Sequence, residues 1–298
     1  LTLIQWLQSN DWDCVLITEE CAEQPFQTDI CTAYQMPTYN HILRDKLCWG
    51  KDKALYLFAK QKVDVSSFDI IFCSSYYYFP LYAAHLLAKE FNIPLAIDLR
   101  DIAEQWGDTP YFTRQITPFH KLNYWIGKLY ERRQLYMRNR ILQTANIVTS
   151  ISPWHQQLLA HYNQNTHLIY NGYDADIFVP KNTISKYFYI TYLGKLYSTQ
   201  LRDPRLLFDA LKQLIAAHQI DASVIRVLFH TDSKGIKEIQ ELGEQYKLTE
   251  LLDINGYIPR QEILPIMHKS SILLVLTTKS TSNGTHGIMG TKFFENIG

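Results

Sequence analysis

The sequence lacks a surplus of either charge. Lys and Arg number 29 and Asp and Glu number 29 in 298 residues, so the formal net charge at pH 7 is zero. A chain without a global field does not attract nucleic acid or an anionic surface as a whole, and a charged partner would need a local patch. We therefore expect no nucleic-acid partner.

The sequence also lacks the marks of exported, membrane-spanning and zinc-binding proteins. Its five cysteines lie in the first quarter and form no CxxC pair, which favours reduced thiols in the cytoplasm. The longest clear apolar run, 272–276, has the length of a strand, and no stretch is long enough to span a membrane. The first residues do not resemble a secretion signal. We expect a cytoplasmic protein that touches the inner face of a membrane only with its surface.

Short apolar strands alternate with helical patterns along the whole chain, which is typical of parallel sheets built from βαβ units. The first series of predicted strands comprises 14–18, 69–73, 94–98, 146–151 and 167–170. The second comprises 188–193, 224–230, 252–254 and 272–277, with helices near 204–218, 236–246 and 260–268. Hydrophobic residues make up 47% of the chain, which is enough to fill two cores.

A polar segment without periodicity, 171–186, separates the two series and contains Gly172 and Pro180. We predict an N-terminal domain over 1–172, a linker over 173–186 and a C-terminal domain over 187–298. The predicted class is α/β, with two Rossmann-like domains that face each other across a cleft. Open parallel sheets bind ligands at the carboxyl ends of their strands, so we expect the chemistry there. Both ends of the sequence interrupt helical patterns, and we interpret it as a fragment whose second domain is incomplete.

The stretch 278–295 is the most informative for chemistry. A predicted strand runs into a polar loop that contains Gly284, Gly287 and Gly290, and a helix then begins at Thr291. Glycines permit a ligand to approach the backbone closely, and free amides at a helix start favour a phosphate. Glu295, one turn later, can accept hydrogen bonds from ribose hydroxyls. A loop followed by an ordinary helix with a solvated glutamate explains the pattern equally well.

Two cations follow the predicted strand 188–193. Lys195 comes directly after Gly194, and Arg202 precedes the next helix, so both are placed to neutralise a diphosphate leaving group. Taken alone, two solvated surface cations are the more common explanation.

Three charges end the apolar strand 94–98. Arg100 and Asp101 are candidates for contact with a sugar or an acceptor, since active-site groups often follow buried parallel strands. For Asp98 we favour a structural ion pair with Arg100.

Five segments occur in an order that is specific as a set: Leu99-Arg100-Asp101, 147–152, 169–174, 193–196 and Gly290-Thr291-Lys292-Phe293-Phe294-Glu295. This order resembles that of family 4 glycosyltransferases of the GT-B type. The resemblance implies a retaining, hexosyltransferase-type transfer from a nucleotide sugar to an acceptor held by the N-terminal domain, without a metal or another cofactor.

The same resemblance implies roles for single residues. Glu295 would bind the ribose, Lys195 and Arg202 the diphosphate, and the amides of Gly290 and Thr291 the phosphates. The residues of an interdomain loop beside the donor would be Asn171, Gly172 and Asp174.

The sequence departs from the family pattern in two places. The family often has a second carboxylate eight residues before Glu295, where this chain has Gly287, and recognition of the donor sugar would then involve the adjacent His286. No first strand and glycine-rich loop precede Leu1, which truncation explains. Asp174-Ala175-Asp176 spells the DxD string of metal-dependent enzymes, but it lies in the predicted junction, and we reject a metal site there.

A long helix is predicted over 113–143, with aromatic and basic residues interleaved. Its basic residues are Arg114, Lys121, Lys128, Arg132, Arg133, Arg138 and Arg140, which against Glu131 give seven minus one, a local charge of +6. This composition suits an anionic membrane or a lipid-linked acceptor. A helix with an aromatic core face and a solvated basic face is an equally good interpretation.

The leading hypothesis is a glycosyltransferase that takes part in the synthesis of a cell-surface polysaccharide or glycolipid. A sugar-nucleotide epimerase or a phosphorylase of the same architecture is the alternative. A non-catalytic nucleotide-binding module also stays open, because Gly287 replaces a carboxylate.

Overall fold

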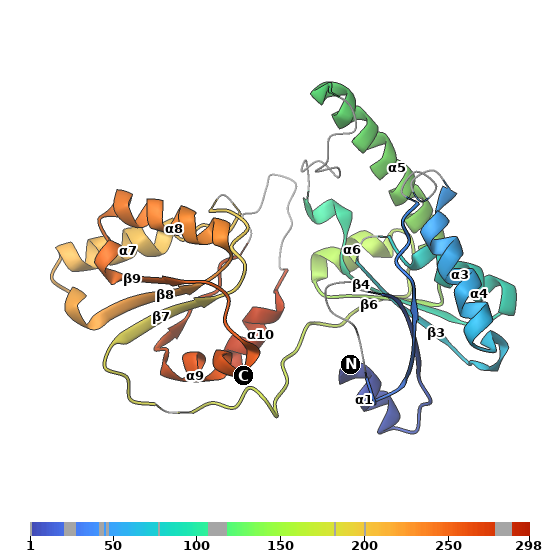
Figure 1. The fold of residues 1–298 in the computed structure, drawn as a ribbon, viewed down its shortest axis with the longest axis horizontal. Coiled ribbons are helices and arrows are strands. Elements are labelled where there is room, and N and C mark those ends of the chain that lie inside the picture. The colour runs from blue at the N-terminus through green and yellow to red at the C-terminus, as the bar shows by residue number, and fades with distance from the viewer. Residues whose placement is uncertain are drawn as a thin grey trace. The chain divides into compact units, whose positions relative to one another are not determined.

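The computed structural model describes residues 2–20, 28–41, 45, 48–76, 78–106, 118–181, 183–199, 201–277 and 288–298. The chain divides into two compact units, Leu1–Ile169 and Tyr170–Gly298. Both units are built on parallel strands with helices beside them, which confirms the α/β class (Figure 1). The separate linker over 173–186 stays a prediction.

The first unit contains two parallel sheets. Four strands lie in the order β3 (Ile71–Tyr76), β4 (Leu95–Asp101), β5 (Ile147–Ser150) and β6 (Thr166–Leu168), and β1 (Val15–Glu19) pairs with β2 (Thr32–Met36). The described helices are α1 (Thr2–Gln8), α3 (Gly50–Lys62), α4 (Leu81–Phe91), α5 (His120–Thr144) and α6 (Pro153–Ala160). The first series of predicted strands is therefore confirmed to within a few residues, while β2 and α3 were not predicted.

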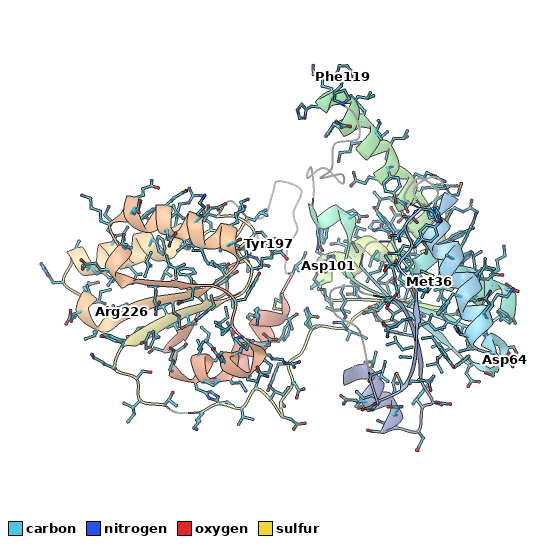
Figure 2. The ribbon with its side chains drawn as sticks, viewed as in Figure 1. Met36, Asp64, Asp101, Phe119, Tyr197 and Arg226 are labelled. Carbon is cyan, nitrogen blue, oxygen red and sulfur yellow. The ribbon has the colours of Figure 1, made fainter. Side chains whose placement is uncertain are left out.

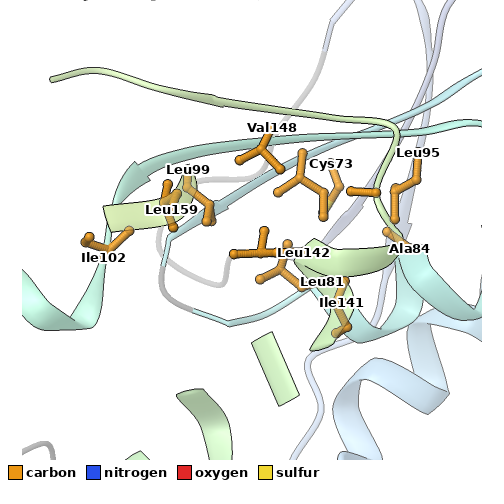
Figure 3. Close-up of a cluster of buried hydrophobic side chains, with 12 residues drawn as sticks. Cys73, Leu81, Ala84, Leu95, Leu99, Ile102, Ile141, Leu142, Val148 and Leu159 are labelled. Carbon is orange, nitrogen blue, oxygen red and sulfur yellow. The ribbon is translucent and has the colours of Figure 1, made fainter. Parts of the chain in front are cut away.

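The core of the first unit positions the end of β4. Residues of β3, β4 and β5 pack against α4, α5 and α6 in one cluster that includes Leu81, Leu99, Leu142 and Val148 (Figure 3). Five consecutive residues of β4, 95–99, are buried, as expected for a strand covered on both faces. The strand then leaves the core at Arg100 and Asp101, so these side chains follow a rigid element.

The second unit has one parallel sheet in the order β10 (Ile272–Leu273), β7 (Phe188–Leu193), β8 (Ile225–His230) and β9 (Leu252–Asn255). Figure 1 shows α7 (Arg205–Ala216) and α8 (Ser233–Tyr246) on one side of the sheet, and α9 (Arg260–Lys269) and α10 (Thr291–Ile297) on the other. The predicted strand 272–277 is too long, because regular pairing ends at Leu273. Leu274 and Leu276 still pack against the core.

The helix predicted over 113–143 is wrong at its start, and one of its predicted basic residues is buried. Among the described residues it begins at His120, and 113–117, with Arg114, lie outside them. Arg138 is only 2% exposed, and its two Nη atoms donate to the Glu104 carboxylate at 2.8 and 2.6 Å. Arg138 is therefore not part of a surface patch, since its charge is paired with Glu104.

In the described part of the chain, no helix combines the length and the apolar composition that a transmembrane segment needs.

Candidate functional site

The turn after β7 is shaped by Gly194. Its φ of 154° is a backbone conformation that residues with a side chain rarely adopt. The Gly194 amide donates to the His230 carbonyl at 3.0 Å, and the next buried residue, Leu196, donates its amide to Thr231 Oγ1 at 3.1 Å. The turn is thus fastened to the end of β8, and Lys195 lies between its two attachment points.

The structure brings Lys195 and Arg202 together around one aromatic ring. Lys195 Nζ lies 4.8 Å and Arg202 Cζ 5.0 Å from the centroid of the Tyr197 ring, which is labelled in Figure 2. Arg202 Nη1 donates to the Lys195 carbonyl and, at 3.2 Å, to Tyr192 Oη. Neither cation forms an ion pair with a carboxylate in the part of the chain that the structure describes. Two positive charges held this close favour an incoming dianion.

The first turns of α8 form hydrogen bonds with the segment that follows β7. Asp232 caps the helix by accepting from the Gly235 amide at 3.1 Å. Glu238 Oε2 accepts hydrogen bonds from the Thr199 amide at 2.6 Å and from the Thr199 hydroxyl at 2.9 Å. The hydrogen bond from the amide lowers the pKa of the Glu238 carboxyl. The segment that carries the two cations is therefore attached to the end of β8 and to α8 at Gly194, Leu196 and Thr199.

Residues after β6 lie beside the start of α10. Asn171 Nδ2 donates to the Met289 carbonyl at 3.2 Å, and the Tyr170 and Phe294 rings are 6.4 Å apart. The space where a Cβ would sit is open at both Gly172 and Gly290. Two of the predicted donor-binding segments, 171–174 and 290–295, are thus neighbours with room beside their glycines.

The other predicted donor-binding residues have defined surroundings of their own. Glu295 is largely buried and pairs with Lys292 Nζ at 2.9 Å. Asp174 accepts from the Asp176 amide at 3.1 Å, which gives the first carboxylate of the DxD string a part in a local turn. Gly287 and His286 lie outside the described residues.

The cations and α10 follow neighbouring strands. β10 pairs with β7 in parallel, so the segments that leave both strands depart from the same edge of the sheet. Lys195 and Arg202 follow β7, while Thr291 and Glu295 belong to the helix after β10. This edge is our candidate donor site in the second unit.

In the first unit, Asp98 joins three strands. It is 4% exposed, and its carboxylate accepts from Thr149 Oγ1 at 2.7 Å, from Ser74 Oγ at 3.3 Å and from Arg100 Nε at 2.9 Å. The expected ion pair with Arg100 is present. Asp101, at the end of β4 in Figure 2, is instead bound by Gln105, whose Nε2 donates to Oδ1 at 2.5 Å.

Comparisons with known proteins agree with this architecture. The sequence profile described as Glycosyltransferase Family 4 matches residues 1–177. Sucrose-phosphate synthase from Thermosynechococcus elongatus superposes with a TM-score of 0.62 at 14% identity, over 91% of this chain and 67% of that one. No curated protein sequence matches significantly.

A second solved structure, Anabaena HepE in complex with UDP, matches with a TM-score of 0.50 at 15% identity, over 82% of this chain and 60% of that one. HepE in complex with UDP-glucose gives 0.50 at 13% identity, over 87% and 72%. At such identities the likeness shows the fold alone, and it extends through both units of the chain.

Proposed function

Since the chain belongs to glycosyltransferase family 4, we propose that it transfers a hexosyl group from a nucleotide sugar to a glycan or lipid-linked acceptor, with retention of configuration. The reaction would serve the synthesis of a cell-surface polysaccharide in the cytoplasm. The observation that carries the proposal is the pair Lys195 and Arg202, held around Tyr197 at the end of β7 without a carboxylate partner among the described residues.

The two cations suit a diphosphate leaving group. Negative charge on the diphosphate grows as the glycosidic bond breaks, so groups fixed beside it stabilise the transition state more than the bound donor. Arg202 is already oriented by Tyr192 and by the Lys195 carbonyl, and little ordering remains when the donor arrives.

The remaining donor contacts come from the same unit. We assign ribose binding to Glu295, phosphate contact to the amides of Gly290 and Thr291, and the donor-side loop to Gly194, Asn171, Gly172 and Asp174. We assign recognition of the donor sugar to His286 and Gly287. The HepE structures in complex with UDP and with UDP-glucose support a nucleoside diphosphate sugar as the donor class.

The acceptor side belongs to the first unit, where we assign Arg100 and Asp101 to contact with the acceptor or the sugar. The Asp98 carboxylate holds Arg100 Nε, which orients this guanidinium at the strand end.

We also propose that α5 brings the protein to an anionic membrane. Four of its exposed apolar residues recur at intervals of three, four and seven and so lie on one face: Leu122, Trp125, Leu129 and Tyr136, which are 47, 66, 72 and 61% exposed. Arg132 and Arg140 are exposed on the same face. Phe119, at the tip of the helix in Figure 2, is 67% exposed. An apolar stripe with cations beside it fits the interface of an anionic bilayer.

The proposed chemistry is tested with Lys195→Ala and Arg202→Ala. We expect each to lower kcat by about ten- to a hundredfold and to change the KM for the donor by less, because the lost stabilisation belongs to the transition state. Lys212→Ala, an exposed lysine of α7, is the control. A higher KM with unchanged kcat would contradict the assignment, and interconversion of the free donor without transfer would indicate an epimerase.

A further inference from the structure

A hydrogen-bonded chain of three polar side chains lies at the carboxyl end of β4. Gln105 lies in the short 3-10 helix Ala103–Trp106, and it bonds to Asp101 on one side and to His155 on the other. The Gln105 Oε1 to His155 Nε2 distance is 3.1 Å, and His155 is fully buried at the start of α6. The residues are 50 positions apart in sequence and come from different elements.

One backbone amide sets the direction of every bond in this chain. The Ile102 N–H lies 3.4 Å from Gln105 Oε1 and can only donate. Gln105 must therefore direct its Oε1 to the Ile102 N–H and its Nε2 to Asp101. If the amide were flipped, its oxygen would face the Asp101 carboxylate, and two acceptors would oppose each other. Because that oxygen also faces His155, the ring must carry its proton on Nε2. The direction is His155 to Gln105 to Asp101.

The surroundings keep His155 neutral, as this direction requires. Burial lowers the pKa of His155 to about 4, although the carboxylates of Asp101 and Glu104 raise it, and Arg138 adds to the lowering. Its Nδ1 is buried and has no hydrogen-bond partner among the described residues, so a second ring proton would be unsatisfied. Asp101 is partly exposed, and its Oδ2 accepts no bond within the described part of the chain.

We propose that Gln105 and His155 are positioning residues that fix Asp101 Oδ1, so that Oδ2 accepts a hydrogen bond from a hydroxyl of the acceptor or sugar. The inference rests on the proposed transferase function and adds two residues that act through Asp101. Water can solvate a partly exposed carboxylate, so the stability of the fold alone does not require a protein donor at Oδ1.

Double substitution separates the two explanations. Gln105→Leu removes both bonds, and we expect kcat to fall at least tenfold while the KM for the donor changes less than twofold. In an Asp101→Asn background the same change should cost less than twofold, because the residue through which Gln105 acts is already altered. Equal losses in both backgrounds would overturn the proposal.

The histidine offers a conservative variant for the same test. His155→Gln keeps an N–H donor near the position of Nε2, whereas His155→Phe keeps the ring volume and loses the donor. We expect His155→Gln to retain activity within about threefold and His155→Phe to match Gln105→Leu. Two variants with equal activity would overturn a role for the donor, and melting temperatures show whether both are folded.

The pH profile adds a readout that folding alone does not move. Gln105→Glu places a second carboxylate beside Asp101 and leaves Asp98, Arg100, Glu104 and Arg138 in place. Like charges at this distance resist simultaneous ionisation, so the acidic limb of kcat/KM should move up by about one pH unit. An unchanged limb would contradict the proposal.

Failure of the proposed function would look different. A wild-type protein that transfers no sugar from any donor would contradict the transferase assignment itself. Ring 15N signals of His155 test the hydrogen-bond chain without activity: a neutral Nε2–H ring that changes in Gln105→Leu supports it, and an Nδ1–H or doubly protonated ring at pH 7 overturns it.

Discussion

Two buried ionisable side chains respond to pH with opposite sign. His155 has a pKa lowered to about 4 by burial, so the unfolded chain binds the additional proton between about pH 4 and 6.5, and folding becomes less favourable as pH falls through that window. Burial raises the pKa of Asp52 to about 7, although the Ala83 and Tyr82 amides donate to it. Its contribution is present below about pH 4 and is lost as pH rises through 7.

Because the two contributions have opposite signs, they partly cancel in the pH dependence of the free energy of unfolding of wild type. A substitution that removes one group makes the contribution of that group measurable. We expect the free energy of unfolding of wild type to fall by about 2 kcal/mol relative to His155→Gln between pH 7.5 and 5.0, because one unit of pKa shift corresponds to about 1.4 kcal/mol. Urea unfolding at the two pH values measures the difference. A constant difference between the two proteins would mean that His155 titrates normally in the folded state.

At the scale of single elements, α8 has two glycines with different neighbours. A Cβ at Gly235 would lie 2.7 Å from Asp232 Oδ1, 2.8 Å from Thr231 Oγ1 and 3.0 Å from Leu196 Cβ, so it would push the helix away from the turn that carries Lys195. A Cβ at Gly243 would have one neighbour within 3.0 Å, Leu252 Cδ1 at 2.5 Å, which is the end of a flexible side chain. The first position is fixed by packing and the second is not.

We therefore expect Gly235→Ala to lower the free energy of unfolding by about 1–3 kcal/mol and to weaken nucleotide binding. Gly243→Ala is the matched control in the same helix. It should be nearly neutral, because the helix propensity of alanine offsets a small side-chain adjustment by about 1 kcal/mol. Similar losses in both variants, measured by urea unfolding, would argue against the contact between Gly235 and the turn.

The exposed face of α5 makes its own prediction. Surface attraction is worth about 1 kcal/mol for each basic residue near anionic lipid. Wild type should sediment with anionic vesicles and not with neutral ones, and high salt should release it. We expect Arg132→Gln with Arg140→Gln to reduce binding about tenfold or more, and Trp125→Ser with Leu129→Ser to reduce it as well.

The matched control for α5 is Lys212→Gln with Lys237→Gln, which removes the same charge from exposed positions of the second unit. Binding that ignores lipid charge, or that falls equally in this control, would leave α5 without a specific role at the membrane. Arg138 has no place in this test, because its substitution would leave Glu104 without its partner.

Buried strands were predictable because each contains a short apolar run. β4 begins with Leu95-Ala96-Ile97 and β8 contains Val227-Leu228-Phe229, and both strands lie within a few residues of the prediction. α3 was missed because its buried residues include Gly50 and Asp52, so hydrophobic periodicity does not mark its inner face. Gln105 and His155 were missed for another reason: their contact joins residues 50 positions apart, and no local pattern encodes such a pair.

At the scale of the whole molecule, the main core of each unit is separate from that of the other, which permits each unit to respond to a ligand on its own. One cluster of buried residues belongs to the first unit around Leu99 and Leu142, and another to the second around Phe208 and Phe229. The sequence predicted the strands of the two four-stranded sheets, and with them the strand ends where Lys195 and Asp101 lie. The facing of the two domains across a cleft stays a prediction.

A nucleoside diphosphate should stabilise the second unit selectively. Bound at a hundred times its Kd, a ligand adds about 2.7 kcal/mol to the unit that holds it. We therefore expect hydrogen exchange to slow in 193–202 and 289–295 when UDP is added, while the core strands of the first unit exchange at unchanged rates. Equal protection of both units, or protection of the first alone, would contradict a donor site at the edge formed by β7 and β10.

Glu295→Ala then shows whether the ribose is held as proposed. Losing a charge-assisted hydrogen bond costs about 1.5–3 kcal/mol, so calorimetry should report a Kd for UDP that is about ten- to a hundredfold weaker than that of wild type. Lys292→Ala is the control, because it removes the 2.9 Å ion pair and leaves the Glu295 carboxylate in place. If Glu295→Ala and wild type bind UDP equally while 193–202 is still protected, the diphosphate contacts stand and the ribose must be held by another group.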